Sequence, residues 1–212
     1  MNYRDTYRFG DVVLREFWNE RYCNELYAYG EEPNTFFKWY IDSHPPGIVL
    51  LPGEGEGRNA VYAAMNHWEV HAIDFSSEGK RKALALAEKN NVKIDYRVSD
   101  INNSELDENT YDLIALIYLH IHERERIHRS IIPCLKMNGI VLLEGFSKEQ
   151  INNDTGGPRD PSRLFSLEDL QSNFTDLEIE YARQEEIQLN AGLYHQGKGS
   201  VIRLLAKKRD SF

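Results

Sequence analysis

The chain has 212 residues, of which 34 are acidic and 25 are basic, and its net charge is −9. This length predicts one domain, residues 1–212. The acidic excess argues against a protein that holds a nucleic-acid backbone, because such a protein needs a basic face. The apolar runs are only as long as strands, far short of the about 20 residues that cross a bilayer, so no membrane segment is expected.

Two features bear on the cellular compartment. The first residues are polar and charged and contain no apolar signal core. Cys23 and Cys134 lie far apart in the chain, and we interpret both thiols as reduced. Together these features favour a cytoplasmic protein. The sequence leaves the oligomeric state open.

The beginning of the chain differs from the rest. Residues 11–42 carry aromatic side chains at helical spacing, among them Phe17, Trp18 and Phe37. This pattern predicts an N-terminal helical cap, residues 1–45, ahead of a sheet core, residues 46–212. We interpret most of these aromatic residues as helix-packing residues, and Tyr29 as the exception, because Tyr29-Gly30 predicts a turn.

Strands and helices alternate from residue 47 onward. Apolar runs predict strands at 47–52, 69–74, 93–98, 111–118 and 140–146. Amphipathic stretches predict helices at 58–66, 78–90 and 123–135, and Ser76 or Ser77 can cap the second of these. Short connections between such elements are typical of the α/β class, with a Rossmann-like, doubly wound sheet.

The C-terminal part breaks this alternation. Ser166 can cap a short helix that ends at Asn173. Residues 178–189 and 201–207 then predict two strands joined by a loop that contains glycine, with no helix between them. Because parallel neighbours need a crossover, these two strands should form an antiparallel hairpin. The sheet is therefore expected to have seven strands and to be mostly parallel.

The most informative motif lies where the first predicted strand ends. Gly53, Gly55 and Gly57 stand at alternate positions, and a helical pattern follows at once. Glycines allow a tight turn whose backbone N–H groups can approach a ligand. The N-terminus of the helix behind the turn favours negative charge or a ligand carboxylate.

Acidic residues add information about the ligand. Asp74 and Asp100 stand at the ends of the second and third predicted strands, at the sheet edge where open α/β sheets bind ligands. Glu54 and Glu56 lie inside the glycine turn and would repel a pyrophosphate while tolerating a cation, unless both point into solvent. The glycine spacing also departs from the G-x-G-x-x-G dinucleotide fingerprint, because Arg58 follows Gly57 directly.

With these motifs placed, the chain resembles the class I S-adenosylmethionine-dependent methyltransferases over nearly its whole length. The glycines match that family's loop, Asp74 matches its ribose-binding acid, and Leu135–Glu144 resembles its turn into the fifth strand. The nearest resemblance is to the small bacterial branch related to the tellurite-resistance and thiopurine methyltransferases. One departure is Leu51, which stands where many members have an acid that orients the methionine end of the cofactor.

The resemblance implies S-adenosylmethionine as cofactor, S-adenosylhomocysteine as product, and no metal. It implies that Asp74 holds the ribose hydroxyls, that Phe75 flanks the adenine, and that Asp100-Ile101 lies near the adenine amino group. The expected cofactor-binding residues are Tyr29, Gly53, Glu54, Gly55, Gly57, Arg58, Asn59, Asp74, Phe75, Ser76, Asp100, Ile101 and Ile117.

The resemblance also places the end of the fourth strand beside the transferable methyl group. We therefore expect His120, Tyr118 and His122 to be the catalytic candidates, with His120 as a base or as a residue that positions the acceptor. A metal site at His120, His122 and His128 is disfavoured, because no cysteine or carboxylate pattern completes a ligand set. The loop at 154–161 is a candidate lid.

These features together predict methyl transfer to a small-molecule acceptor by in-line displacement. Two alternatives stay open. A protein that binds S-adenosylmethionine without transferase activity is kept open by Leu51. A nicotinamide-dependent oxidoreductase is disfavoured by the glycine spacing and by the terminal hairpin.

Overall fold

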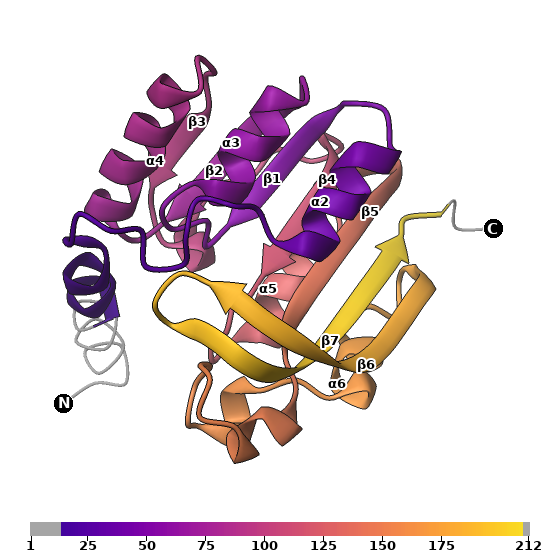
Figure 1. The fold of residues 1–212 in the computed structure, drawn as a ribbon. Coiled ribbons are helices and arrows are strands. Elements are labelled where there is room, and N and C mark those ends of the chain that lie inside the picture. The colour runs from indigo at the N-terminus through magenta and orange to yellow at the C-terminus, as the bar shows by residue number, and fades with distance from the viewer. Residues whose placement is uncertain (1–13, 210–212) are drawn as a thin grey trace, which may run out of the picture.

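A computed structural model describes residues 14–209 (Figure 1). The first residues of the predicted helical cap therefore lie outside the described part, in which residues 14–22 are helical. The strands are β1 (Ile48–Pro52), β2 (Glu69–Asp74), β3 (Asp95–Val98), β4 (Tyr111–Ile117), β5 (Leu135–Phe146), β6 (Glu178–Ala191) and β7 (His195–Lys207). The α-helices are α2 (Thr35–Ser43), α3 (Arg58–Met65), α4 (Ser77–Lys89), α5 (Arg124–Ile131) and α6 (Leu167–Asn173).

The seven strands form one mixed sheet in the order β3-β2-β1-β4-β5-β7-β6. The strands β1 to β5 are parallel to one another, whereas β7 is antiparallel to both β5 and β6. The order reverses between β1 and β4, which creates the crevice where open α/β sheets bind ligands. The predicted Rossmann-like fold with an antiparallel C-terminal hairpin is confirmed (Figure 1).

Several predicted boundaries were wrong, each for a local reason. The helix expected to reach residue 135 ends at Ile131, two residues before Pro133. Ile132 keeps helical φ and ψ, but Pro133 has no N–H to continue the hydrogen-bond ladder of the helix. The hairpin strand expected at 201 begins at His195, which pairs with Ala191. Gly197 and Gly199, which fall in the predicted loop, pair with Leu189 and Ile187 of β6.

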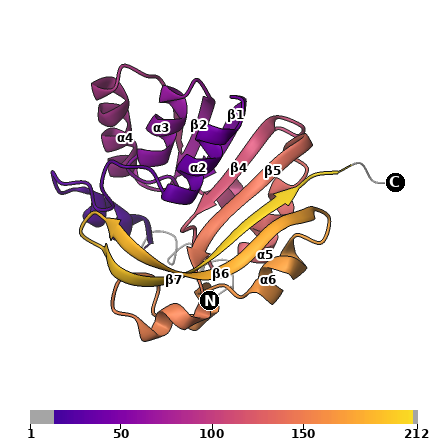
Figure 2. The ribbon, with the colours of Figure 1, turned by 45° about the vertical axis from the view of Figure 1, so that its right-hand side comes forward.

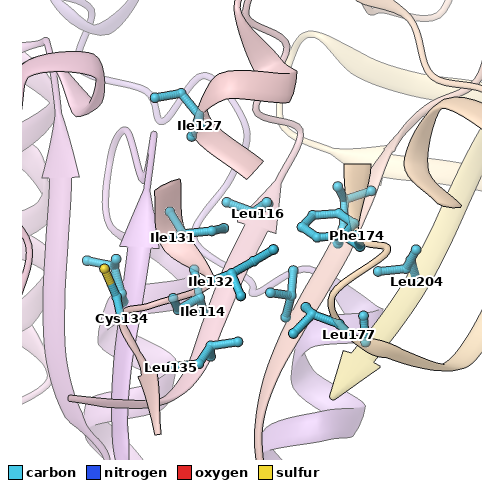
Figure 3. Packing of buried hydrophobic residues seen from close by; sticks show 14 of the residues in the cluster. Ile114, Leu116, Ile127, Ile131, Ile132, Cys134, Leu135, Phe174, Leu177 and Leu204 are labelled. Carbon is cyan, nitrogen blue, oxygen red and sulfur yellow. The ribbon is translucent and has the colours of Figure 1, made fainter. Parts of the chain in front are cut away.

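The helices cover both faces of the sheet. Phe37 of α2, Ala60 of α3 and Ala83 of α4 belong to one buried cluster with the first sheet face. On the other face, which α5 and α6 cover (Figure 2), Ile127 of α5 and Leu170 of α6 belong to a second buried cluster. Figure 3 shows this second cluster, in which side chains from β4, α5 and the segment after α6 meet over the sheet. None of the described helices is long and apolar enough to pass through a lipid bilayer.

Gly57 lets α3 and α4 approach each other closely. Its backbone has φ +90°, and a Cβ built there would lie 2.5 Å from Cβ and 2.7 Å from Cα of Ala83 in α4. Backbone atoms cannot yield as a flexible side chain does, so both the conformation and the contact require glycine. Gly57 is also the N-cap of α3, directly after the turn that closes β1.

We expect Gly57→Ala to destabilise the fold by at least about 2 kcal/mol, because it adds left-handed strain and a helix–helix clash. Equilibrium unfolding in urea measures this change. Gly139 of β5 does not provide a matched control, because a Cβ there would also meet backbone atoms. Ala64→Gly, on the partly exposed side of α3, is a suitable control variant. A loss for Gly57→Ala of less than about 0.5 kcal/mol would show that the two helices can separate freely.

Candidate functional site

A pocket lies at the carboxyl ends of β1, β2, β4 and β5, at the predicted ligand edge of the sheet. It runs from the glycine turn to an aromatic region beside β7. The sequence-predicted residues that line it are Tyr29, Gly53, Glu54, Arg58, Asn59, Asp74, Phe75, Ile101, Ile117, Tyr118 and His120. The structure therefore brings together side chains from the N-terminal segment, the turn and three strand ends.

Asp74 fastens the glycine turn to the end of β2. Its Oδ2 accepts a hydrogen bond from the Gly55 N–H at 3.0 Å, and its Oδ1 accepts one from the Ser76 N–H at 2.8 Å. Burial raises the pKa of the Asp74 carboxyl to about 6, although these hydrogen bonds oppose the rise. Each carboxylate oxygen can accept more than one hydrogen bond, so capacity remains for a ligand.

The two loop glutamates have different surroundings, and neither points into solvent. Both oxygens of the Glu56 carboxylate are engaged, Oε1 by Lys82 at 2.6 Å and Oε2 by the Ala28 N–H at 2.7 Å. Lys82 also donates to the Asn24 and Leu26 carbonyls. This buried ion pair therefore fastens the N-terminal segment to α4.

Glu54 forms no ion pair with a described residue, although the charge of Arg58 opposes the rise of its pKa. Its Oε1 accepts from the N–H groups of Asn59 and Ala60, both at 2.8 Å, in the first turn of α3. Burial raises the pKa of the Glu54 carboxyl to about 7. Leu51, at the position where an acid is common in the family that the sequence resembles, is 1% exposed in the core. Glu54 is thus the acid of the turn that remains without a counter-ion.

The helical residues 14–22 cover one side of the pocket. Trp18, Arg21 and Tyr22 line it, and the rings of Trp18 and Tyr22 are stacked with centroids 5.4 Å apart. Asn19 fixes this segment to α4, because its Oδ1 accepts from Ser76 Oγ at 2.6 Å. The N-terminal aromatic residues thus serve as pocket cover as well as helix packing.

Other predicted residues do not line the pocket. Ser76 is fully buried, and its hydroxyl caps α4 by accepting from the Gly79 N–H. Asp100 accepts three hydrogen bonds from Asn102 and Asn103 in its own turn. His122 is exposed on the surface. Gly55 and Gly57 shape the turn without lining the pocket.

The loop at 154–161 contributes to the pocket through its middle. Gly157 and Pro158 line the pocket. Arg159 is exposed and pairs with Asp154 at 2.7 Å, so it points away from the pocket. This loop is therefore part of the pocket wall.

His120 lines the pocket but has both ring nitrogens engaged. Nδ1 lies 2.8 Å from the Arg163 carbonyl oxygen, and Nε2 accepts from the Phe146 N–H at 3.1 Å. Because a carbonyl can only accept, Nδ1 carries the proton. Burial lowers the pKa of His120 to about 4. In this geometry the ring has no free nitrogen to act as a base, and it joins the ends of β4 and β5.

Tyr118 is held in place by a buried network. It has φ +54°, uncommon for a residue with a side chain, and its hydroxyl donates to Glu144 Oε1 at 2.8 Å. The same oxygen accepts from Asn34 Nδ2 at 2.6 Å, and Oε2 accepts from Arg203 Nε at 2.6 Å. This network ties α2, β4, β5 and β7 together beneath the Tyr118 ring.

Sequence reasoning missed several pocket residues. Phe146 reaches the pocket from the end of β5, Arg163 from the segment that follows β5, and His195 from the start of β7. One signal for His195 was present in the sequence. Residues 195, 197, 199 and 201 share one strand face if the alternation before Val201 is extended backward through the two glycines.

No three of the described His, Cys, Asp and Glu residues cluster in a way that could hold a metal ion. The three histidines of the disfavoured metal hypothesis lie in different surroundings. His120 is engaged by backbone groups, His122 is exposed, and His128 is buried against Asn173. Cys23 and Cys134 are both free thiols.

Comparisons with known proteins agree with this fold. Residues 49–139 match the model of a methyltransferase domain family, from β1 into β5. A search of the curated proteins found no significant match. The solved structures compared below are all under 25% identical to the chain, so their similarity shows the fold alone.

A protein studied for the conversion of a disulfide bond into a thioacetal group in echinomycin biosynthesis has a TM-score of 0.74 at 14% identity, covering 92% of each chain. A methyltransferase from Methanosarcina mazei, described as SAM-dependent, has a TM-score of 0.67 at 18% identity, covering 85% of this chain and 100% of its own. TehB from Haemophilus influenzae has a TM-score of 0.69 at 20% identity, covering 92% of this chain and 67% of its own. The chain thus has the fold of the S-adenosylmethionine-dependent methyltransferases, and its residues 49–139 match a methyltransferase domain family.

Proposed function

We propose that this protein transfers a methyl group from S-adenosylmethionine to a small-molecule acceptor. The observation that carries the proposal is one continuous pocket that joins Asp74 and the glycine turn to the aromatic region around Tyr118. The family match covers the glycine turn, the end of β2 at Asp74 and the end of β4 at Tyr118. We further propose that the chain works as one domain in the cytoplasm and belongs to the branch that includes TehB.

The residues around the turn suit this cofactor. The Asp74 carboxylate can accept hydrogen bonds from two ribose hydroxyls, and Phe75 and Ile101 offer apolar contact to an adenine ring. Glu54, buried and without a cationic partner, is the group that would receive the ammonium of the methionine end. Glu56 is less suited to that role, because Lys82 already neutralises it. Glu54 and Asp74, which form no ion pair with a described residue, disfavour a pyrophosphate at this end of the pocket.

Bound S-adenosylmethionine supplies an electrophilic sulfonium methyl group. The protein aligns the acceptor with that group and excludes water, and well-oriented reactants gain roughly 7–11 kcal/mol from proximity. Trp18, Tyr22, Gly157 and Pro158 all line the pocket and help to exclude water from it. Tyr118, fixed by Glu144, and His120, fixed by two backbone groups, act as positioning residues for the acceptor.

Thermal unfolding with added ligands tests the proposal. S-adenosylhomocysteine at a hundred times its dissociation constant should stabilise the protein by about 2.7 kcal/mol, or roughly 5–10 °C for a chain of this size. NAD at the same concentration is the control and should have no effect. Stabilisation by NAD alone would replace the proposal with an oxidoreductase.

A non-catalytic protein that binds S-adenosylmethionine is the second candidate, favoured by the apolar Leu51 in place of an orienting acid. The two candidates differ in turnover. Formation of S-adenosylhomocysteine across a panel of thiol, carboxylate, phenol and amine acceptors supports the transferase. Tight binding without turnover on any class supports the second candidate.

A further inference from the structure

The described part of the chain buries three histidines, and they differ in how their ring nitrogens are satisfied. Both nitrogens of His120 are paired with backbone groups, and His128 Nδ1 lies 3.0 Å from Asn173 Nδ2. His195 is 5% exposed, and its buried Nδ1 has no hydrogen-bond partner among the described residues. Since buried polar groups are nearly always paired, this ring indicates a missing partner.

His195 lies in the aromatic region of the pocket. It is the first residue of β7, and its ring centroid is 4.7 Å from the rings of both Tyr29 and Tyr118 and 5.2 Å from that of Phe146. A Cβ at Gly156 would lie 3.0 Å from its Cδ2. These neighbours hold the ring but offer no hydrogen bond, and the ring lines the pocket.

The charges near His195 are positive. Arg58 donates to the Tyr29 carbonyl at 3.0 Å, and Arg21 donates to the Tyr29 hydroxyl at 3.1 Å, so both guanidiniums contact Tyr29, whose ring packs on His195. Burial, followed by Arg58, His120 and Arg21, lowers the pKa of His195 to about 3. The imidazole is therefore neutral at neutral pH, and one of its nitrogens carries a proton to donate.

We propose that His195 donates a hydrogen bond to the methyl acceptor, and that Arg21 and Arg58 select an acceptor that enters as a small anion. This inference rests on the proposed function, since it assigns the substrate class of the same pocket. Each guanidinium has five N–H donors, so those two arginines keep free donors beyond Tyr29. An anion completes the pairing of His195, whereas a protonated amine meets like charges. His195 is thus a positioning residue that does not take up the acceptor's proton.

Three probes of one shape and different charge test this selection. Benzoate, benzamide and benzamidine share a ring and carry charges of −1, 0 and +1. Each is titrated by NMR, which measures millimolar affinities, into the protein with and without S-adenosylhomocysteine. We expect benzoate to bind at least about tenfold more tightly than benzamidine, with benzamide between them. Equal binding of the three probes, or preference for benzamidine, overturns the inference.

Variants of His195 separate a hydrogen-bonding role from a packing role. His195→Phe keeps a flat ring without a donor, and His195→Asn restores an N–H donor. We expect His195→Phe to weaken benzoate binding by about tenfold and His195→Asn to recover most of it. Gln196→Ala, at the exposed next position of the strand, is the control and should bind benzoate like the unaltered protein. Unchanged benzoate binding by His195→Phe contradicts the proposal.

Cofactor binding is measured separately for every variant, so that the two proposals fail in different ways. If S-adenosylhomocysteine does not stabilise the unaltered protein, the proposed function fails, while the benzoate preference is still measured without it. If S-adenosylhomocysteine binds and benzoate has no advantage, the acceptor class fails alone. If His195→Phe weakens S-adenosylhomocysteine as much as benzoate, His195 belongs to the cofactor end and the inference is wrong.

Discussion

Replacing Glu54 by glutamine should make the ligand-free protein more stable at pH 8 by up to about 3 kcal/mol. The pKa of this buried carboxyl rises from 4.5 to about 7 on folding. A raised pKa in the folded state means that stability is fully present below about pH 4.5 and is lost as the pH rises through 7. Glutamine keeps an oxygen for the Asn59 and Ala60 N–H groups and has no charge to desolvate. Urea unfolding of both proteins between pH 4.5 and 8 measures the difference.

Glu56→Gln is the matched contrast, two residues away in the same turn. Glu56 neutralises Lys82, whose side chain is 4% exposed, so its replacement leaves a buried ammonium without its partner. Breaking such a pair by removing one partner costs about 3–5 kcal/mol. The two glutamates therefore have opposite predicted effects at pH 8. A loss of stability for Glu54→Gln at that pH would mean that its carboxylate is compensated by more than two backbone donors.

Glu54→Gln should also change the affinity for the cofactor. If the desolvated carboxylate is retained for the ammonium of the cofactor, Glu54→Gln should bind S-adenosylhomocysteine about tenfold more weakly while being the more stable protein. Calorimetric titration at pH 8 measures this affinity. A gain in stability with unchanged affinity would assign Glu54 to the turn and to capping of α3 alone.

The sequence predicted the fold well because most of its signals are local. Alternating strands and helices, a glycine turn and serine caps at positions 76 and 166 each depend on residues within a few positions of one another, and the structure confirms them. Prediction was weaker at the ends of elements. Glycine by itself favours a loop, so the strand conformation at Gly197 and Gly199 could not be predicted from the sequence. It depends on their pairing with β6.

About half of the pocket could be predicted, again because only local signals can be recognised in a sequence. The residues of the turn and of the strand ends lie next to recognisable elements, so their edge of the sheet could be inferred. His195 and Arg163 come to the pocket through contacts with residues far away in the chain, such as the pairing of β7 with β5. The sequence also does not show whether a buried side chain has a hydrogen-bonding atom free for a ligand. His120 and His195 are both buried histidines, and only the contacts of their nitrogens distinguish them.

Asp74 and Asp100 differ in the same way. Both acids stand at strand ends and both are predicted to bind the cofactor, but Asp74 lines the pocket, whereas Asp100 accepts hydrogen bonds within its own turn. We expect Asp74→Ala to weaken S-adenosylhomocysteine binding by about 100-fold or more, since two hydrogen bonds to a charged group are worth about 3 kcal/mol or more together. Asp100→Ala should change the affinity by less than about threefold. Calorimetric titration of the two variants measures both.

Asp74 also holds the Gly55 and Ser76 N–H groups, so a loss of binding could arise from a displaced turn. Asp74→Asn separates the two causes, because its carbonyl oxygen still accepts from one of these backbone groups while the charge is gone. If the turn alone matters, Asp74→Asn should bind S-adenosylhomocysteine almost as well as the unaltered protein. If the carboxylate holds the ribose, it should lose about tenfold, between the unaltered protein and Asp74→Ala. Equal losses for Asp74→Ala and Asp100→Ala would contradict the placement of the ribose at Asp74, because only one of these side chains reaches the pocket.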